Sequence, residues 1–311
     1  MEKTNKTDDL FYFQKVDERQ SEIISAPQYS YWGSVARTFF SSKVAIVMLV
    51  VLAIVLVMAI IHPLISGFNN MNVAHINDRS QWFLRPSADH LFGTDDVGRD
   101  MFDAVWSGAR TSLMIAFIAT AISVVVGVVV GMFWGFSKSL DAIMIEIYNV
   151  ISNVPYLLVV MILSYTLGAG VWQLVFALSL TDWIFTAYFI RVQVMIIRDR
   201  EYNLASRTLG SSRVKIITHN VFPYLISVIM TTISRSVPNV ISYEVYLSYI
   251  GVGLTQETAS LGRLVQENAK HMQSAPYLFV IPVFVTALIS VSLYIVGQTL
   301  ADASDPRNHM I

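Results

Sequence analysis

Apolar residues gather in six long runs along the chain, and short polar segments separate them. The runs cover residues 44–65, 112–136, 142–167, 171–192, 222–247 and 277–300. Each reaches the roughly 20 residues that a helix needs to cross a hydrocarbon core. Backbone groups inside lipid must be satisfied internally, and these runs are far longer than the strands of a membrane barrel. The pattern therefore predicts an all-α polytopic membrane protein with six transmembrane helices.

The segment before the first apolar run has an amphipathic helical pattern of its own. Trp32, Val35, Ala36, Phe39 and Phe40 recur at helical spacing. This predicts a short amphipathic helix on the inner membrane face, with an extension of the first span as the alternative. The expected organisation is an N-terminal cytoplasmic segment (1–43), a first transmembrane helix (44–66), an extracellular loop (67–111), a five-helix core (112–300) with a cytoplasmic loop (198–223), and a cytoplasmic tail (301–311).

Composition agrees with a membrane protein. The chain is 54% hydrophobic and 14% charged, whereas about a quarter of the residues in soluble domains carry charge. A formal net charge of -1 argues against nucleic-acid binding. The absence of cysteine excludes disulfides and thiolate chemistry. The polar N-terminus lacks the apolar core of a cleaved signal peptide.

Basic residues indicate the orientation. They concentrate before the first run and between the fourth and fifth runs, the latter set being Arg191, Arg198, Arg200, Arg207, Arg213 and Lys215. Cytoplasmic loops carry an excess of Lys and Arg. Both termini and the loop 198–223 are therefore expected in the cytoplasm.

No sequence motif indicates an enzyme. The chain has no P-loop, no G-x-S-x-G elbow and no H-E-x-x-H pair, so we expect it neither to bind ATP through a P-loop of its own nor to catalyse a reaction. The segment "HLFGTDDVGRD" (90–100) gathers several carboxylates, but its spacing fits no standard calcium loop. A structured outer loop is favoured, in which Gly93 and Gly98 allow tight turns and the carboxylates satisfy Arg99 and nearby N–H groups.

Charged residues also occur inside the apolar runs, and they are Glu146, Asp182, Arg235 and Glu244. Such residues cost about 2.5 to 3.5 kcal/mol each at a helix centre on insertion scales. They are tolerated where they face a polar cavity or each other. With Pro238 expected to kink the fifth span, this predicts a pathway wall, and a structural ion pair between helices remains the alternative.

Small residues favour close helix packing in the second run. Gly127, Gly131 and Gly135 are spaced four apart, so they share one helix face.

The loop "LASRTLGSSRVKIITHNVFP" (204–223) interrupts the apolar pattern. Glu201 suits the first turn of a short helix, and Gly210 suits its left-handed end. Ser211 or Ser212 can cap a second short helix, and Pro223 is expected to start the next span. The sequence predicts a compact helix–turn–helix projection; an ordinary structured loop is the alternative.

This projection resembles the Glu-Ala-Ala loop of ABC importer permeases. Ala205, Ser206, Gly210 and Pro223 stand at matching positions, whereas Leu204 replaces the family's glutamate. Asn220 and Phe222 replace its isoleucine and leucine. Glu201, one turn earlier, is a candidate substitute for the glutamate; a second permease carrying the usual residue is the alternative. The resemblance assigns the ATPase-coupling loop to Glu201, Leu204, Ala205, Ser206, Arg207, Gly210 and Pro223.

Three further segments are similar to oligopeptide and dipeptide permeases. "GTDDVGRD" matches an outer-loop motif through Gly93, Thr94, Asp95, Gly98, Arg99 and Asp100. Segments 244–254 and 302–307 match two more motifs, and Leu261 departs from the family's tryptophan. Together the segments identify the chain as similar to the C-type permease subunit of oligopeptide ABC importers, Ami-type systems included.

The resemblance implies a type I ABC importer permease fold in a bacterial cytoplasmic membrane. It also implies partners: a homologous second permease, two cytoplasmic ATPase subunits that bind ATP and Mg, and an extracellular lipid-anchored peptide-binding protein. No cofactor is expected in this chain. Import of dipeptides, glutathione or nickel stays open, and a stand-alone secondary transporter is the alternative of a different class.

Overall fold

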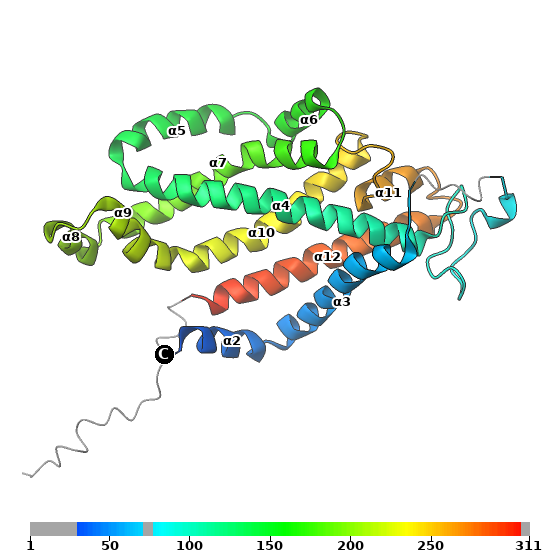
Figure 1. Ribbon diagram of the computed structural model, residues 1–311, viewed down its shortest axis with the longest axis horizontal. Helices are drawn as coiled ribbons and strands as arrows, with labels where there is room; N and C mark the ends of the chain where they lie inside the picture. Colours follow the sequence, from blue (N-terminus) through cyan, green and yellow to red (C-terminus); the bar gives the residue numbers. More distant parts are fainter. Residues whose placement is uncertain (1–29, 71–76, 306–311) are drawn as a thin grey trace, which may run out of the picture.

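The computed structural model describes residues 30–70 and 77–305, and these residues form an almost entirely helical protein (Figure 1). The helices are α2 (Tyr31–Ser41), α3 (Lys43–Ser66), α4 (Met101–Phe136), α5 (Lys138–Ser152), α6 (Tyr156–Leu167), α7 (Val171–Arg198), α8 (Glu201–Thr208), α9 (Arg213–Ile216), α10 (Phe222–Tyr249), α11 (Leu261–Ala269) and α12 (Pro276–Ala303). A 3₁₀ turn, η1 (Arg79–Gln81), and a π-helical turn, η2 (Ile217–Val221), complete the described elements. Residues 1–29 and 306–311 of the predicted terminal segments lie outside the described residues.

Five helical stretches are long and apolar enough to cross a membrane. They are α3, α4, α7, the continuous helix Arg213–Tyr249 and α12. The pair α5 and α6 becomes a sixth span if it is counted as one. The all-α membrane fold predicted from the apolar runs is therefore confirmed.

The third span is broken where the sequence predicted one helix. α5 and α6 are bent by 80° at the segment between Ser152 and Tyr156. Pro155 lies in this break; it lacks a backbone N–H and disfavours helical backbone at the residue before it. Mean hydropathy across 142–167 does not reveal the break, because apolar residues predominate in the helices on both sides of it.

Two spans are longer than their apolar runs. α4 begins at Met101, so residues 101–111 of the predicted outer loop are helical. Asp100 starts this helix because its carboxylate accepts hydrogen bonds from the backbone N–H groups of Phe102 and Asp103, at 2.7 and 3.4 Å. α7 likewise continues past the predicted end to Arg198. Charged residues at the start of α4 and at the end of α7 lower the local hydropathy, so the apolar pattern did not include these turns.

The predicted glycine face of α4 packs closely against α7. A Cβ atom at Gly127 would lie 2.6 Å from the Thr186 Cβ, and one at Gly131 would lie 2.5 Å from the Ala187 carbonyl oxygen. Real Cβ contacts essentially never fall below 3.0 Å. The two helices therefore approach to a distance that only glycine permits, as the four-residue spacing predicted.

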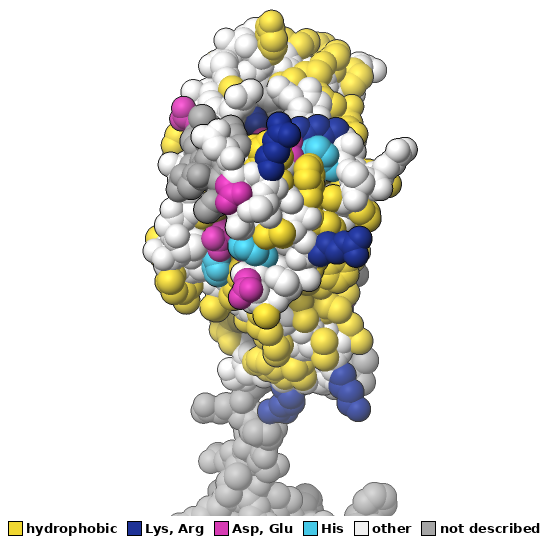
Figure 2. All heavy atoms as spheres, turned by 90° about the vertical axis from the view of Figure 1, so that its right-hand side faces the viewer, with side chains coloured by type: hydrophobic (Ala, Val, Ile, Leu, Met, Phe, Trp, Pro, Cys, Tyr) yellow, Lys and Arg dark blue, Asp and Glu magenta, His cyan; other side chains and the backbone are white. Residues whose placement is uncertain are grey.

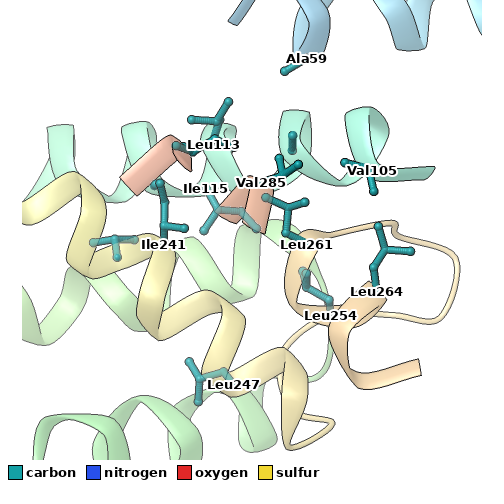
Figure 3. Close-up of a cluster of buried hydrophobic side chains, with 14 of the residues drawn as sticks. Ala59, Val105, Leu113, Ile115, Ile241, Leu247, Leu254, Leu261, Leu264 and Val285 are labelled. Carbon is teal, nitrogen blue, oxygen red and sulfur yellow. The ribbon is translucent and has the colours of Figure 1, made fainter. Parts of the chain in front are cut away.

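The main core joins helices that are far apart in the sequence. Figure 3 shows Leu113 and Ile115 from α4 beside Ile241 from α10, Leu261 from α11 and Val285 from α12. Aliphatic side chains from α3 also point outward; Val47 and Ile54 are among those exposed. A soluble protein would bury such a helix, so this outer face fits contact with lipid or another subunit.

α2 is a separate helix rather than an extension of the first span. Ser42 has an extended backbone and its hydroxyl accepts the N–H of Ala45, which ends α2 and caps α3. Val35 and Phe39 are buried in a cluster with Ala303 of α12. The Tyr31 hydroxyl donates to the Ser304 carbonyl oxygen at 2.8 Å, which ties the two ends of the described chain together.

Candidate functional site

The loop between α7 and α10 lies at the same end of the molecule as α2 and the end of α12 (Figure 1). Its first helix, α8, ends at Thr208, and the turn that follows contains Gly210, whose φ of 83° is left-handed. Ser212 then caps α9, since its hydroxyl accepts the N–H of Lys215 at 3.3 Å. The predicted pair of short helices with a glycine turn is therefore present.

The second short helix does not end before the next span. η2 joins α9 to α10, and the N–H of Phe222 donates to the Ile217 carbonyl, five residues back. Pro223 follows inside the first turn of α10 rather than opening a new helix. Because Pro223 has no N–H, the wider π turn accommodates it without breaking the helix. Pro223 thus lies in the first turn of α10, as predicted for the fifth span, but α9 and η2 extend the same continuous helix back to Arg213.

Polar side chains fix α8 against this long helix. Asn203 is fully buried, and its amide donates to the Ile197 carbonyl oxygen at 3.0 Å. The Asn220 amide donates to Asn203 Oδ1 at 2.9 Å and to Ser206 Oγ at 3.2 Å. Asn220, a departure from the family motif, therefore contacts Ser206, which stands at one of the motif's small positions. Sequence reasoning missed Asn203, although its placement on the face of α8 opposite Glu201 and Ala205 could have suggested a buried polar contact.

The opposite face of α8 is open. Glu201, Leu204 and Ala205 are exposed there, at helical positions that share one face. Leu204 is 45% exposed, and Leu209 at the tip of the loop is 85% exposed. Exposed leucines on an ordered loop outside the apolar spans suit contact with another protein.

The predicted pathway residues are not brought together. Arg235 and Glu146 are exposed on α10 and α5, and Asp182 is partly buried on α7 with Oδ2 lacking a hydrogen-bond partner among the described residues. No ion pair within residues 30–70 and 77–305 joins any two of the four charged residues predicted for the pathway. The alternative of an ion pair between them therefore has no support in the described part of the chain.

Glu244 does not line a surface of this subunit. It is fully buried, and its carboxyl group accepts hydrogen bonds from Ser112 of α4 at 2.7 Å and from Ser248 at 2.8 Å. The N–H of Leu261 donates in turn to the Ser112 hydroxyl at 3.2 Å. This network joins α4, α10 and α11, so we correct the interpretation of Glu244 from pathway wall to internal packing.

The outer-loop motif forms the ordered loop that its glycines and carboxylates predicted. Asp95 accepts the N–H groups of Val97 and Arg99 at 3.0 and 2.8 Å, and the Arg99 guanidinium at 2.5 Å. Gly93 and Gly98 have left-handed φ values of 77° and 76°. Arg99 also contacts Glu267 at 3.2 Å, which fastens the loop to α11.

A second contact fastens the same loop to the segment before α12. Asp96 accepts from Lys270 at 2.7 Å and pairs with His271 at 3.0 Å. Partial burial raises the pKa of Asp96, but the hydrogen bonds from Lys270 and His271 outweigh it and hold the pKa below its usual value. Charged and histidine side chains gather on this end of the molecule (Figure 2). Among the described residues, no group of His, Asp and Glu is arranged to hold a metal ion.

Comparison with known proteins assigns the family. Residues 127–309 match the binding-protein-dependent transport system inner membrane component family, and residues 30–86 match the N-terminal TM domain of oligopeptide transport permease C. The chain belongs to this inner membrane component family. The predicted resemblance to C-type permeases of peptide importers is confirmed.

Curated relatives cover nearly the whole chain. The oligopeptide transport system permease protein AmiD of Streptococcus pneumoniae is 50% identical over 299 residues, which is 96% of this chain and 97% of AmiD. The dipeptide permease DppC of Bacillus subtilis is 33% identical over 303 residues, 96% of this chain and 93% of DppC. OppC of the same organism is 33% identical over 288 residues, 92% of this chain and 93% of OppC.

A solved structure supports the fold. A chain of the MetNI methionine ABC transporter, captured facing inward, superposes with a TM-score of 0.50 at 14% identity. The match covers 63% of this chain and 96% of the MetNI chain. At this identity the match shows a shared fold over that part of the chain.

Proposed function

We propose that this chain is one of two permease subunits in an ATP-driven importer of oligopeptides. A 50% identical relative over almost its full length is an oligopeptide permease, which favours peptides over glutathione or nickel. Dipeptides stay a second candidate because DppC proteins are 33% identical. A homologous permease would complete the pathway, and an extracellular lipid-anchored protein would deliver peptides to the outer loop.

The loop 198–223 would couple this pathway to a cytoplasmic ATPase. The observation that carries the proposal is the ordered pair of short helices in this loop. The hydrogen bond between Asn203 and Asn220 fixes one face of α8, and the face with Glu201 and Leu204 is exposed. ATP and Mg would be bound by two partner ATPases, and this chain would supply no catalytic group. Closure of the ATPases would move the loop and, through the continuous helix Arg213–Tyr249, the membrane pathway.

A glycine pair tests the coupling role. Gly210 (φ 83°) and Gly67 (φ 60°, ψ 24°) both follow a helix end with left-handed φ, and no atom lies within 4 Å of a Cβ added at either. Valine at either position carries the same backbone cost, about 1–3 kcal/mol. In the reconstituted transporter, we expect Gly210→Val to abolish peptide-stimulated ATP hydrolysis and uptake, while Gly67→Val, at the end of α3, retains both. Equal activity of the two variants would contradict a coupling role.

A further inference from the structure

A basic hollow of about 460 Å³ lies where the coupling loop meets the end of α4 and the start of α5. Lys138, Arg198, Arg207 and Arg213 line it, and Asp199 is its one carboxylate. Four cations and one carboxylate leave a net charge of +3 in a small volume. Neither peptide passage nor the open face of α8 explains this arrangement.

Three of the four cations in this hollow form no ion pair with a described residue. Arg198 is satisfied, because it pairs with Asp199 at 3.0 Å and donates to the Gly135 carbonyl oxygen at 2.7 Å. The Arg207 guanidinium lies 4.7 Å from the centre of the Phe136 ring, with no carboxylate within salt-bridge distance in the described chain. Lys138 and Arg213 likewise form no ion pair with a described residue.

The lining matches a phosphate group. Ser137, Ser139 and Ser211 also line the hollow, so its lining combines ammonium, guanidinium and hydroxyl groups with a single carboxylate, that of Asp199. Arginine and lysine bind phosphate through charge-assisted hydrogen bonds that are about twice as strong as neutral ones. Ser211 and Arg213 belong to the loop, whereas Ser137 and Lys138 belong to the membrane helices, so a single phosphate would bridge the two.

The position of the hollow indicates the source of that phosphate. α4 is longer than a hydrocarbon core requires, but its apolar run 112–136 ends at Phe136, so we expect the hollow near the depth of the lipid headgroups. Arg207 also folds back toward Phe136 instead of extending beyond the loop. We infer that the hollow binds the phosphate headgroup of an anionic phospholipid in the leaflet on the coupling-loop side. Basic pockets between membrane helices bind anionic headgroups in this way.

Native mass spectrometry of the full chain tests this assignment, with phosphatidylglycerol and phosphatidylcholine as probes. Wild type should retain phosphatidylglycerol preferentially, and Lys138→Gln with Arg213→Gln should reduce its apparent affinity by about tenfold or more, the loss expected for charge-assisted hydrogen bonds. The control pair Arg37→Gln with Lys43→Gln removes two exposed cations from the same end, outside the hollow, and should change little. Arg213→Lys keeps the charge and should retain most binding, which separates loss of the site from loss of the fold.

Other occupants give different results. Inorganic phosphate at millimolar concentration should compete only weakly with the lipid; saturation by phosphate without any preference for phosphatidylglycerol would overturn the lipid source. Equal retention of both lipids, or an equal effect of the control pair, would overturn the site. If Lys138→Gln with Arg213→Gln leaves lipid binding intact but abolishes ATPase co-purification, the hollow binds the partner protein and the inference is wrong.

Discussion

Arg235 lies exposed on α10, one of the long membrane helices, and it has no ion-pair partner among the described residues. A cation in such a position is costly unless it meets water or a polar ligand. We propose that it faces the pathway completed by the second permease, where it would attract a peptide carboxylate. Glu244, nine residues later and buried in its serine network, cannot share this role.

Removal of the Arg235 charge should slow transport without unfolding the subunit. We expect Arg235→Ala to reduce peptide uptake by about tenfold, the effect of one lost charged hydrogen bond, and Arg235→Lys to reduce it less. Uptake of labelled peptide into vesicles is the measurement, with complex yield as the control. Normal uptake would remove Arg235 from the pathway, and loss of the assembled complex would assign it a structural role.

Glu201 and Leu204 give a second contrast at the residue scale. Both are exposed on the open face of α8, and Leu204 occupies the position of the family's glutamate. If Glu201 supplies the missing carboxylate, Glu201→Ala should lower the co-purified ATPase roughly fivefold, as expected for about 1 kcal/mol at an interface. Leu204→Ala should lower it less. The reverse order would show that the loop docks through its apolar side chains.

At the scale of elements, the contact between α4 and α7 depends on glycine. A Cβ at Gly131 would lie 2.5 Å from a backbone oxygen, which cannot move aside alone. Gly131→Ala should therefore destabilise the protein by about 1–3 kcal/mol and lower its apparent Tm in detergent.

Gly33 in α2 is the matched control, since a Cβ there meets nothing closer than 3.4 Å. Gly33→Ala should be neutral or stabilise by about 0.5–1 kcal/mol, because alanine favours the helix. An unchanged Tm in Gly131→Ala would mean that the two helices are free to separate.

At the scale of the whole molecule, the arrangement makes one prediction about sidedness. The turn between α8 and α9 and the segment between α10 and α11 lie at opposite ends of the helical bundle (Figure 1). Leu209 belongs to the first and Glu257 to the second. The chain contains no cysteine, so single cysteines can report on each end. We expect Glu257→Cys to react with a membrane-impermeant maleimide in intact cells. Leu209→Cys, expressed without the ATPases, should react only after permeabilisation.

The cysteine-free parent is the control for both labels. Reaction of Leu209→Cys in intact cells would place the loop outside and contradict the ATPase-coupling proposal, because ATP is hydrolysed in the cytoplasm. Labelling of both ends in intact cells would instead indicate a different number of spans.

The sequence by itself determined the class, the family and most of the helices. Apolar runs of some 20 residues have few folded alternatives, so length and hydropathy sufficed for α3 and α12 and for most of α7. The glycine turn at Gly210 and the close face at Gly127 and Gly131 were also predictable, because each depends on local geometry or on helical periodicity.

Only the tertiary structure decided what depends on neighbours distant in sequence. Burial of Glu244 requires serines from α4 and α10, and the role of Asn203 requires Asn220 from the helix that follows. The bend before α6 and the π turn before α10 result from competition between proline and helix continuation, which hydropathy does not measure. A polar residue in an apolar run has the same insertion cost whether it faces a pathway or a partner, so the sequence pattern alone could not distinguish Arg235 from Glu244.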